Sequence, residues 1–317
     1  MLLMSLHPST DILADAIAKY AEVQNTTTLS RLLRAVYNLL LEGADIIIPV
    51  AAQAAEAGQI ALVTHTTDND NLVYVAAYTE NVTLPDAKEF TTIERPLANY
   101  FEAILQMEGI AGIIFNPTSP TPFTMQKKML SELLAQLQQG KAKNSIGVWR
   151  GDITTLDCDV IVNAANSSLL GGGGVDGAIH AAAGPELLRE CSNLNGCQTG
   201  EAKITFGYDL KAPYVIHTVG PIYNGKTSQR LELADCYRNS LDLAKKHHLH
   251  SIAFSAISTG VYGYPVEEAA RIALLTVTQW LNANPTYGMN IILTCFNSAV
   301  QNAYESVIEA AKKGELE

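Results

Sequence analysis

Four consecutive glycines, Gly171–Gly174, stand directly before Val175 and Asp176, where a helix is predicted to begin. Glycine adopts positive φ without strain and lets the backbone approach another group closely. The first N–H groups of a helix have no partner within the helix and attract anions. The alternative is a loop that binds nothing, but four glycines between two apolar segments would be costly in such a loop. We therefore predict an anion-binding loop.

A second loop of the same kind spans Ser258–Pro265, with the sequence STGVYGYP. It follows a predicted strand, Ile252–Ile257, and again precedes a predicted helix. Either glycine loop alone is a weak signal. Two such loops at the ends of neighbouring strands would suit two linked phosphates, because each offers backbone N–H groups to one of them.

Two single residues also follow predicted strands. Asp152 comes just after Ile146–Arg150, where its carboxylate either accepts a hydrogen bond from the amino group of a base or caps a turn. Phe296 follows Ile291–Cys295, where its ring either stacks on a base or lies at the rim of the core. Spacing alone does not separate these alternatives.

The charge of the chain restricts its ligands. The net charge is −11, and both halves are acidic. Up to Ser145 there are 9 Lys and Arg residues against 15 Asp and Glu residues, and after Ser145 there are 12 against 17. Neither half offers a basic surface, so nucleic acid is not an expected partner. An anionic ligand must be held by backbone N–H groups and helix N-termini.

The composition, 48% hydrophobic and 17% charged, is that of a soluble globular protein, and 317 residues allow two domains. The longest apolar run, Asp45–Ala57, is interrupted by Pro49 and Gln53 and is too short to cross a membrane. Five cysteines without a CxxC pair predict neither a disulfide framework nor a structural zinc site. Met1–His7 lacks a basic start and a cleavage site, so we expect the mature N-terminus of a cytoplasmic protein.

The elements that must position these loops alternate in the second half. The predicted strands are Ile146–Arg150, Val160–Asn163, Ala202–Gly207, Tyr214–Val219, Ile252–Ile257 and Ile291–Cys295. The predicted helices are Asp176–Leu194, Leu231–His247, Val266–Asn282 and Ala299–Lys312. Apolar strands alternating with helices predict a mostly parallel sheet covered on both faces. Ligand sites of such sheets lie beyond the carboxyl ends of the strands.

The first half mixes helices and strands. Helices are predicted from a cap at Ser9 to Ala21, from a cap at Thr28 to Leu41, from Pro96 to Met107, and from Phe123 to Gln139. Strands are predicted at Ile46–Val50, Ile60–His65, Leu72–Tyr78 and Gly112–Phe115, with a turn at Asp68–Asn71. Gly140–Ser145 is short and polar, which is typical of a linker.

Six motifs of the second half occur together and in order: GDIT at Gly151, NAAN at Asn163, GGGGVDGAIHAAAGP at Gly171, NGCQTGEA at Asn195, VIHTVGP at Val215 and STGVYGYP at Ser258. With these motifs the second half closely resembles the macro domain family, and within it the MacroD-type ADP-ribosyl hydrolases. This resemblance implies a three-layer α/β/α fold with a mostly parallel central sheet, over residues 146–317. It also implies an ADP-ribose cleft at the strand ends, where the two glycine loops already pointed.

The resemblance also implies roles for single residues. Asp152 would bind the adenine amino group, and Phe296 would stack on the adenine. The loops Gly171–Val175 and Ser258–Tyr262 would hold the diphosphate, and Tyr262 would pack on the distal ribose. The implied binding residues are Gly151, Asp152, Ile153, Ala164, Ala165, Gly171, Gly172, Gly173, Gly174, Val175, Ile257, Ser258, Thr259, Gly260, Val261, Tyr262, Gly263 and Phe296.

Asn166 and Asp176 match the positions that the family links to catalysis. The resemblance therefore implies hydrolysis of an acyl ester on the distal ribose, either on an Asp or Glu side chain of a mono-ADP-ribosylated protein or in O-acetyl-ADP-ribose. We expect Asp176 to orient or deprotonate the water and Asn166 to fix the ribose. No cofactor and no metal is expected, because the zinc-dependent branch carries its Cys and His ligands where this chain has Gly171–Gly174. The rival functions are a non-catalytic ADP-ribose reader, an adaptor whose function lies in the first half, and a hydrolase that acts on ADP-ribosylated nucleic acid ends. The acidic balance of the chain disfavours the last of these.

The first half contains the pattern LSRLLRAVYNLLLEGADIIIPVAA, then YVAAYT, then GIIFNPTSPTPFTMQKKMLSELL. Over most of Pro8–Leu137 this pattern resembles the N-terminal domain of the SseB family. This resemblance implies a smaller α+β domain over residues 1–140 and no chemistry. We expect this domain either to choose the ADP-ribosylated partner or only to stabilise its neighbour.

Overall fold

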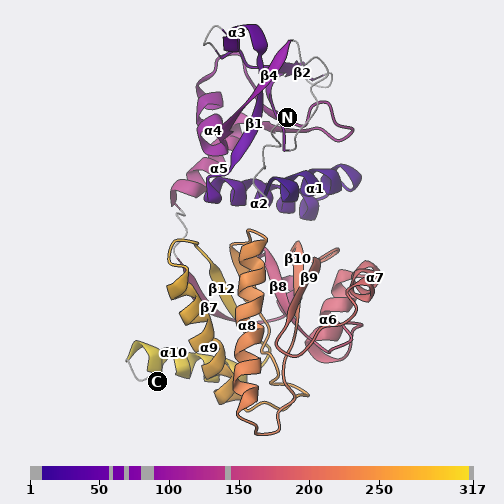
Figure 1. Ribbon diagram of the computed structural model, residues 1–317, viewed down its shortest axis with the longest axis vertical. Helices are drawn as coiled ribbons and strands as arrows, with labels where there is room; N and C mark the ends of the chain where they lie inside the picture. The colour runs from indigo at the N-terminus through magenta and orange to yellow at the C-terminus, as the bar shows by residue number, and fades with distance from the viewer. Residues whose placement is uncertain (1–8, 57–59, 68–70, 80–88, 140–143, 314–317) are drawn as a thin grey trace. The chain divides into compact units, whose positions relative to one another are not determined.

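The computed structural model describes residues 9–56, 60–67, 71–79, 89–139 and 144–313. The chain divides into two compact units, Met1–Lys141 and Ala142–Glu317, which are drawn in Figure 1. Each unit has hydrophobic core clusters of its own. Among the described residues, none of the helices has the length and apolar character needed to cross a membrane.

The first unit is a mixture of helices and short strands. Its helices are α1 Ser9–Glu22, α2 Thr26–Glu42, α3 Ala52–Glu56, α4 Leu97–Gln106 and α5 Lys127–Gln139. Its strands are β1 Asp45–Ala51, β2 Thr64–Thr66, β3 Val73–Ala77, β4 Phe90–Pro96, β5 Gly112–Phe115 and β6 Phe123–Gln126. Strands β1 and β4 form an antiparallel pair, and the other four form a sheet in the order β2-β3-β5-β6. The predicted α+β class of this unit is confirmed.

Several details of the first unit differ from the sequence prediction. Of the predicted strand Ile60–His65, only the part from Thr64 onward is a strand, β2, and the short helix α3 was not predicted. The N-cap of α2 is Asn25, whose side chain accepts from the Thr28 backbone N–H at 2.9 Å, so Thr28 is the third helical residue and not the cap. The segment from Phe123 is the strand β6, because it pairs with β5, and α5 begins only at Lys127. Strand β4 was missed; its pairing with β1 is a tertiary contact.

Three predictions concern residues that are wholly or partly outside the described ranges. They are the N-terminal segment Met1–His7, the turn Asp68–Asn71 and the linker Gly140–Ser145. Of the linker, Asn144 and Ser145 are described. Ser145 already belongs to the first strand of the second unit.

The second unit is built on one six-stranded sheet. Its strands are β7 Ser145–Arg150, β8 Val160–Ala165, β9 Ala202–Phe206, β10 Tyr214–Val219, β11 Ser251–Phe254 and β12 Asn290–Cys295. The order is β7-β12-β11-β8-β10-β9, and every pairing is parallel except that of β9 with β10. Its helices are α6 Gly174–Ala183, α7 Pro185–Asn193, α8 Ser228–Lys246, α9 Val266–Ala283 and α10 Ser298–Lys312, with a 3-10 turn, η1, at Ile153–Thr155.

Helices cover both faces of this sheet (Figure 1). Along β8, Val160 and Val162 pack into the core cluster that also contains side chains of α8, α9 and α10. The alternating residue Ile161 packs into the opposite cluster, which contains side chains of α6 and α7. Successive side chains of a strand point to opposite faces, so each apolar strand contributes side chains to the hydrophobic core on both faces of the sheet. The predicted three-layer α/β/α arrangement is confirmed.

The predicted helix Asp176–Leu194 is wrong as a single element. The chain forms α6 and α7, separated at Gly184, which has φ of +82°. Pro185 then opens α7, where its missing N–H costs nothing. The backbone angle at Gly184 therefore favours glycine at this position.

Candidate functional site

The two glycine loops meet at one edge of the sheet. The first follows β8 and the second follows β11, and these two strands are direct parallel neighbours. The carboxyl ends of parallel strands share an edge, so both loops begin side by side. This is the edge at which parallel α/β sheets bind ligands.

The first loop leads into α6 through two glycines with left-handed backbone, Gly171 with φ of +81° and Gly174 with φ of +63°. Gly173 is the N-cap of α6 and offers no capping side chain. The loop is exposed at Gly172, Gly173 and Gly174. The first N–H groups of α6 are therefore not capped by a side chain, which leaves them available to an anion.

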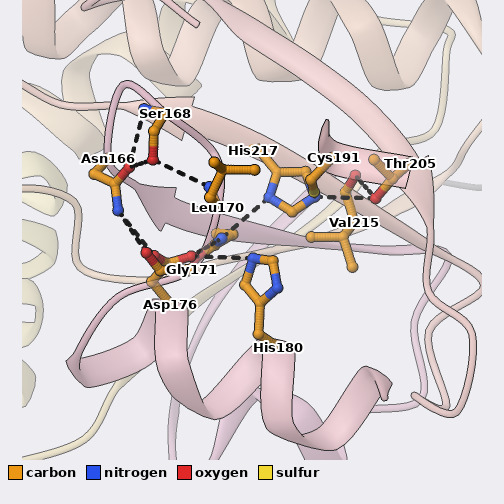
Figure 2. A network of polar contacts seen from close by, with 11 residues as sticks. Asn166, Ser168, Leu170, Gly171, Asp176, His180, Cys191, Thr205, Val215 and His217 are labelled. Carbon is orange, nitrogen blue, oxygen red and sulfur yellow. Dashed lines mark hydrogen bonds and ion pairs between the residues drawn. The ribbon is translucent and has the colours of Figure 1, made fainter. Parts of the chain in front are cut away.

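Asp176 is the third residue of α6, and its side chain is nearly buried, with 4% exposed. Its Oδ1 accepts a hydrogen bond from Asn163 Nδ2 at 2.7 Å, and His180 Nε2 lies 3.6 Å from the same oxygen. Its Oδ2 lies 3.5 Å from Asn166 Nδ2. The two carboxylate oxygens thus have different surroundings: Oδ1 is directed to the interior and Oδ2 to the loop (Figure 2).

Asn166 organises the first loop. Its Nδ2 donates to the Gly171 carbonyl at 2.8 Å, and its Oδ1 accepts from the Ser168 backbone N–H at 3.0 Å and from the Ser168 hydroxyl at 2.6 Å. These bonds tie the strand end to the glycine run, as Figure 2 shows. The expected catalytic pair, Asn166 and Asp176, is brought together by this loop.

Gly172 has no room for a side chain. A β-carbon there would lie 2.9 Å from Asp176 Oδ2 and 3.2 Å from Asn166 Nδ2. At Gly173, by contrast, a β-carbon would meet no atom within 4 Å. The backbone of Gly172 therefore lies directly against both expected catalytic side chains.

The second loop is held in a constrained conformation. Ser258 has φ of +65°, although it is not glycine, and Gly263 has φ of +65°. The Tyr264 backbone N–H closes the loop on the Ser258 carbonyl at 3.0 Å, and the Tyr223 backbone N–H donates to the Tyr262 carbonyl at 2.8 Å. Between them Val261 is 99% exposed. Non-glycine residues with positive φ cluster at functional loops, since the surrounding structure must hold them there.

The remaining predicted residues lie at the ends of β7, β8, β11 and β12. Asp152 caps η1: its Oδ1 accepts from the Thr154 N–H at 3.0 Å and from the Thr154 hydroxyl at 2.8 Å. Its Oδ2 takes neither of these bonds, so capping and base recognition are compatible. Phe296 is 85% exposed, so its ring is not part of the core rim. Ile153, Ala165 and Ile257 are buried, and Gly151, Ala164 and Thr259 are half-buried.

Sequence reasoning assigned no role in the site to four residues around these loops. Asn163 and His217 lie buried behind Asp176. A β-carbon at Gly177 would lie 2.5 Å from the Gly172 carbonyl oxygen, and one at Gly220 would lie 2.1 Å from Ser258 Oγ. The available signals were a polar residue inside an apolar strand for Asn163 and His217, and a glycine inside a predicted helix for Gly177.

Two family models match the chain. The Macro domain model matches residues 162–273, and the model of the SseB protein N-terminal domain matches residues 13–132. The two matched segments fall in different compact units.

Curated relatives match the second half of the chain. The Macro domain-containing protein CT2219 of Chlorobaculum tepidum is 57% identical over 162 residues, which are 51% of this chain and 94% of that protein. The ADP-ribose glycohydrolase MACROD2 of Homo sapiens is 62% identical over 141 residues, 44% of this chain and 33% of that protein. The chain thus spans about a third of the length of the MACROD2 relatives that it matches.

Among solved structures, the Oceanobacillus iheyensis macrodomain with ADP is 47% identical to this chain, with a TM-score of 0.52, and the match covers 54% of this chain and 94% of that one. Mutants of that macrodomain have been solved at an asparagine, at a glycine seven positions later and at an aspartate three positions after that. The same spacing separates Asn166, Gly173 and Asp176 here. With this structural likeness and a relative covered almost entirely, the chain belongs to the macro domain family.

Proposed function

We propose that the second unit binds ADP-ribose and hydrolyses the ester between its distal ribose and an acyl group. The observation that carries this proposal is the contact of Asp176 and Asn166 with the backbone of Gly172, at the start of a helix whose N–H groups are not capped by a side chain. An anion-binding loop with a carboxylate and an amide directly against it suits a nucleotide diphosphate sugar. The names of the MACROD2 relatives and the ADP-bound macrodomain support the same substrate class.

In this proposal the backbone of the two loops holds the diphosphate, with Gly171–Val175 on one side and Ser258–Tyr262 on the other. Asp152 accepts from the adenine amino group through its carboxylate, and the exposed ring of Phe296 stacks on the base. The chain needs no cluster of basic residues for this, in keeping with its net charge of −11.

The hydrolytic step requires one water and a place for its proton. Asp176 orients or deprotonates the water through Oδ2, the carboxylate oxygen on the side of Asn166 and Gly172. The water oxygen bonds to the acyl carbon, the ester C–O bond breaks, and the ribose oxygen leaves with a proton as a hydroxyl. Asn166 holds the ribose during this step. An ester has a fair leaving group, so positioning supplies much of the rate enhancement.

The test is release of ADP-ribose from a protein that carries mono-ADP-ribose on Glu or Asp, with wild type and Asp176→Ala in parallel. We expect release by the wild type, a loss of turnover of at least about 100-fold in the variant, and retained binding of free ADP-ribose. Asp235→Asn is a matched control, because Asp235 is a surface residue paired with Arg238 on α8 and should not affect turnover.

Unchanged turnover in Asp176→Ala would overturn the role of Asp176. If neither protein releases ADP-ribose while both bind it, the second unit is a reader. Hydrolysis of O-acetyl-ADP-ribose is measured alongside, because both substrates carry an ester on the same ribose and one site can serve both.

The proposed partners are mono-ADP-ribosylated proteins, and the proposed compartment is the cytoplasm. The five cysteines all lie within the described residues and are buried thiols rather than disulfides, as expected in a reducing compartment. We also propose that residues 146–317 act as a macro domain and that residues 1–140 contribute to the choice of partner. The match of the SseB model to the first unit supports a separate domain there.

A further inference from the structure

A row of buried polar side chains lies behind Asp176, on the face of the sheet that α6 and α7 cover. It consists of Asn163 on β8, His217 on β10 and Thr205 on β9, three strands that are neighbours in the sheet. Asn163 and His217 are direct partners in the parallel register, and both are 0% exposed; Thr205 is 2% exposed. Buried polar groups destabilise the fold unless they are hydrogen-bonded, so each of these side chains is expected to have a hydrogen-bond partner.

The hydrogen bonds in this row have a defined direction. Asn163 Nδ2 donates to Asp176 Oδ1 at 2.7 Å and lies 3.1 Å from His217 Nδ1, which must therefore be an acceptor. The ring proton of His217 is then on Nε2, which lies 3.0 Å from Thr205 Oγ1. The Thr205 hydroxyl donates to the Val215 carbonyl at 3.5 Å. Figure 2 shows His217 between Thr205 and the Asp176 side of the row.

Burial keeps His217 in this acceptor form. Removal from water and, to a lesser extent, the nearby His180 lower the pKa of the imidazole to about 3. A neutral ring has one acceptor nitrogen and one donor nitrogen. Because Thr205 takes the donor nitrogen, the acceptor nitrogen faces Asn163.

The orientation of the Asn163 amide depends on this acceptor. An amide can rotate by half a turn with little change in shape, and the oxygen would then face Asp176 Oδ1 and His217 Nδ1, which are both acceptors. Asn163 Oδ1 is buried and has no hydrogen-bond partner among the described residues, so it does not hold the amide in place. The amide orientation is therefore fixed by the two acceptors that its nitrogen faces.

We propose that His217 is a positioning residue for the reaction: through Asn163 it holds Oδ1 of Asp176 toward the interior and keeps Oδ2 aligned with Asn166. This inference rests on the proposed hydrolysis. Without the acceptor on His217, the Asn163 amide loses one of the two partners that orient it. The Asp176 carboxylate then rotates away from Asn166 and Gly172, while the backbone loops that bind the diphosphate stay in place.

A metal ion is the other use that these side chains suggest. His180, Cys191 and His217 each offer a ligand atom, and the three atoms lie within 4.8 Å of one another. Both ring nitrogens of His217, however, already serve Asn163 and Thr205. Burial also raises the pKa of the Cys191 thiol to about 12, so the thiolate that a metal needs is disfavoured. The geometry favours the hydrogen-bonded row.

The proposal is tested by two substitutions that each keep one half of the imidazole. In His217→Asn the amide oxygen lies close to the position of Nδ1 and can accept from Asn163, but a cavity remains. In His217→Gln the side chain fills more of the space, and its amide lies at the position of Nε2, toward Thr205. We expect kcat to fall about 100-fold in His217→Gln and only a few-fold in His217→Asn, with the Kd for free ADP-ribose unchanged in both.

This order is the reverse of the order expected for thermal stability, where the smaller side chain should cost more. A purely structural role would make kcat follow the melting temperature, with His217→Asn the worse variant, and that result would overturn the proposal. Equal kcat values for both variants and wild type would also overturn it. If the wild type itself does not hydrolyse the substrate, the proposed function is refuted. Failure of the proposed function can therefore be distinguished from failure of the role proposed for His217.

A second pair of variants covers the case in which substitutions of His217 do not fold. Thr205→Val is nearly isosteric and removes the nearer acceptor of the His217 ring proton, leaving Cys191 Sγ at 3.6 Å as the weaker one, so we expect kcat to fall about 10-fold. Thr205→Ser keeps the hydroxyl and should restore kcat. The control is Thr276→Val, a buried threonine of α9 whose hydroxyl donates to the Ile272 carbonyl of the same helix, and kcat should not change. Equal kcat values in the valine and serine variants of Thr205 would contradict a role of the hydrogen-bonded row in positioning Asp176.

Discussion

Replacing Gly172 by alanine should reduce hydrolysis without removing any group that binds substrate. The new β-carbon would lie 2.9 Å from Asp176 Oδ2 and 3.2 Å from Asn166 Nδ2. Gly172 is not among the residues with positive φ, so its backbone conformation is open to alanine and its N–H remains in the loop. The perturbation is therefore the contact with the two side chains.

Neither side chain can move away freely. Asp176 is tied through Oδ1 to Asn163 at 2.7 Å, and Asn166 is tied to Gly171 and Ser168. Ordinary contact begins near 3.4 Å, so the Asp176 carboxylate must shift by about 0.5 Å, the difference between 3.4 and 2.9 Å. A displacement of 1 Å at a reacting group costs about 100-fold in rate, so half of it corresponds to about 10-fold.

The assay is kcat and KM for release of ADP-ribose from a mono-ADP-ribosylated acidic peptide, with Kd for free ADP-ribose by calorimetry. Gly172→Ala should lower kcat about 10-fold and leave Kd within a factor of two. Gly147→Ala, whose β-carbon meets nothing within 4 Å on β7, is the control. At Gly173 the β-carbon also meets no protein atom, so any effect there should appear in Kd. An undiminished kcat in Gly172→Ala would show that the position of Asp176 does not limit the reaction.

Three further predictions concern binding, stability and domain autonomy. Phe296→Ala should raise the Kd for ADP-ribose about 10-fold through loss of base stacking, with no change in melting temperature, because the ring is 85% exposed; an unchanged Kd would remove Phe296 from the site. His217 stays neutral in the folded state, with its pKa near 3, whereas the unfolded chain binds a proton below about pH 6.5. The free energy of unfolding should therefore fall as the pH drops below 6.5, by about 2 kcal/mol at pH 5. Urea unfolding of His217→Gln should show a fall that is smaller by this amount. An equal fall in wild type and variant would contradict a buried neutral ring. The fragment Lys143–Glu317 should hydrolyse O-acetyl-ADP-ribose at the rate of the full chain, whereas a lower rate would indicate that the first unit contributes to turnover.

The strands of the second unit and the two glycine loops were predictable because their signals are local. Apolar runs between turn residues located all six strands, with β10 predicted at its observed bounds. The loops were recognisable because in both of them glycines stand between a predicted strand and a predicted helix. Elements that depend on a partner were not predictable in this way. Strand β4 forms by pairing with β1, and β6 is a strand rather than a helical turn because it pairs with β5.

The proximity of Asn166 and Asp176 was predictable for a similar reason. Asn166 and Asp176 lie ten residues apart in one continuous motif, and one loop brings them together. The position of Asp152 left two roles open, and the structure adds that its carboxylate caps η1 through one oxygen. For Phe296, the exposure of the ring removes the core alternative, which spacing could not do.

The sequence by itself determined the class of fold, the two glycine loops and the motif that carries Asn166 and Asp176, because each depends on residues close together in the chain. Only the tertiary structure decided which atoms face each other. Asn163, Thr205 and His217 are up to 54 residues apart and meet because β8, β10 and β9 are neighbours in the sheet. The direction of their hydrogen bonds depends on burial, which keeps His217 neutral. Burial and strand order are properties of the whole fold, so no local pattern could reveal which oxygen of Asp176 is directed to the interior.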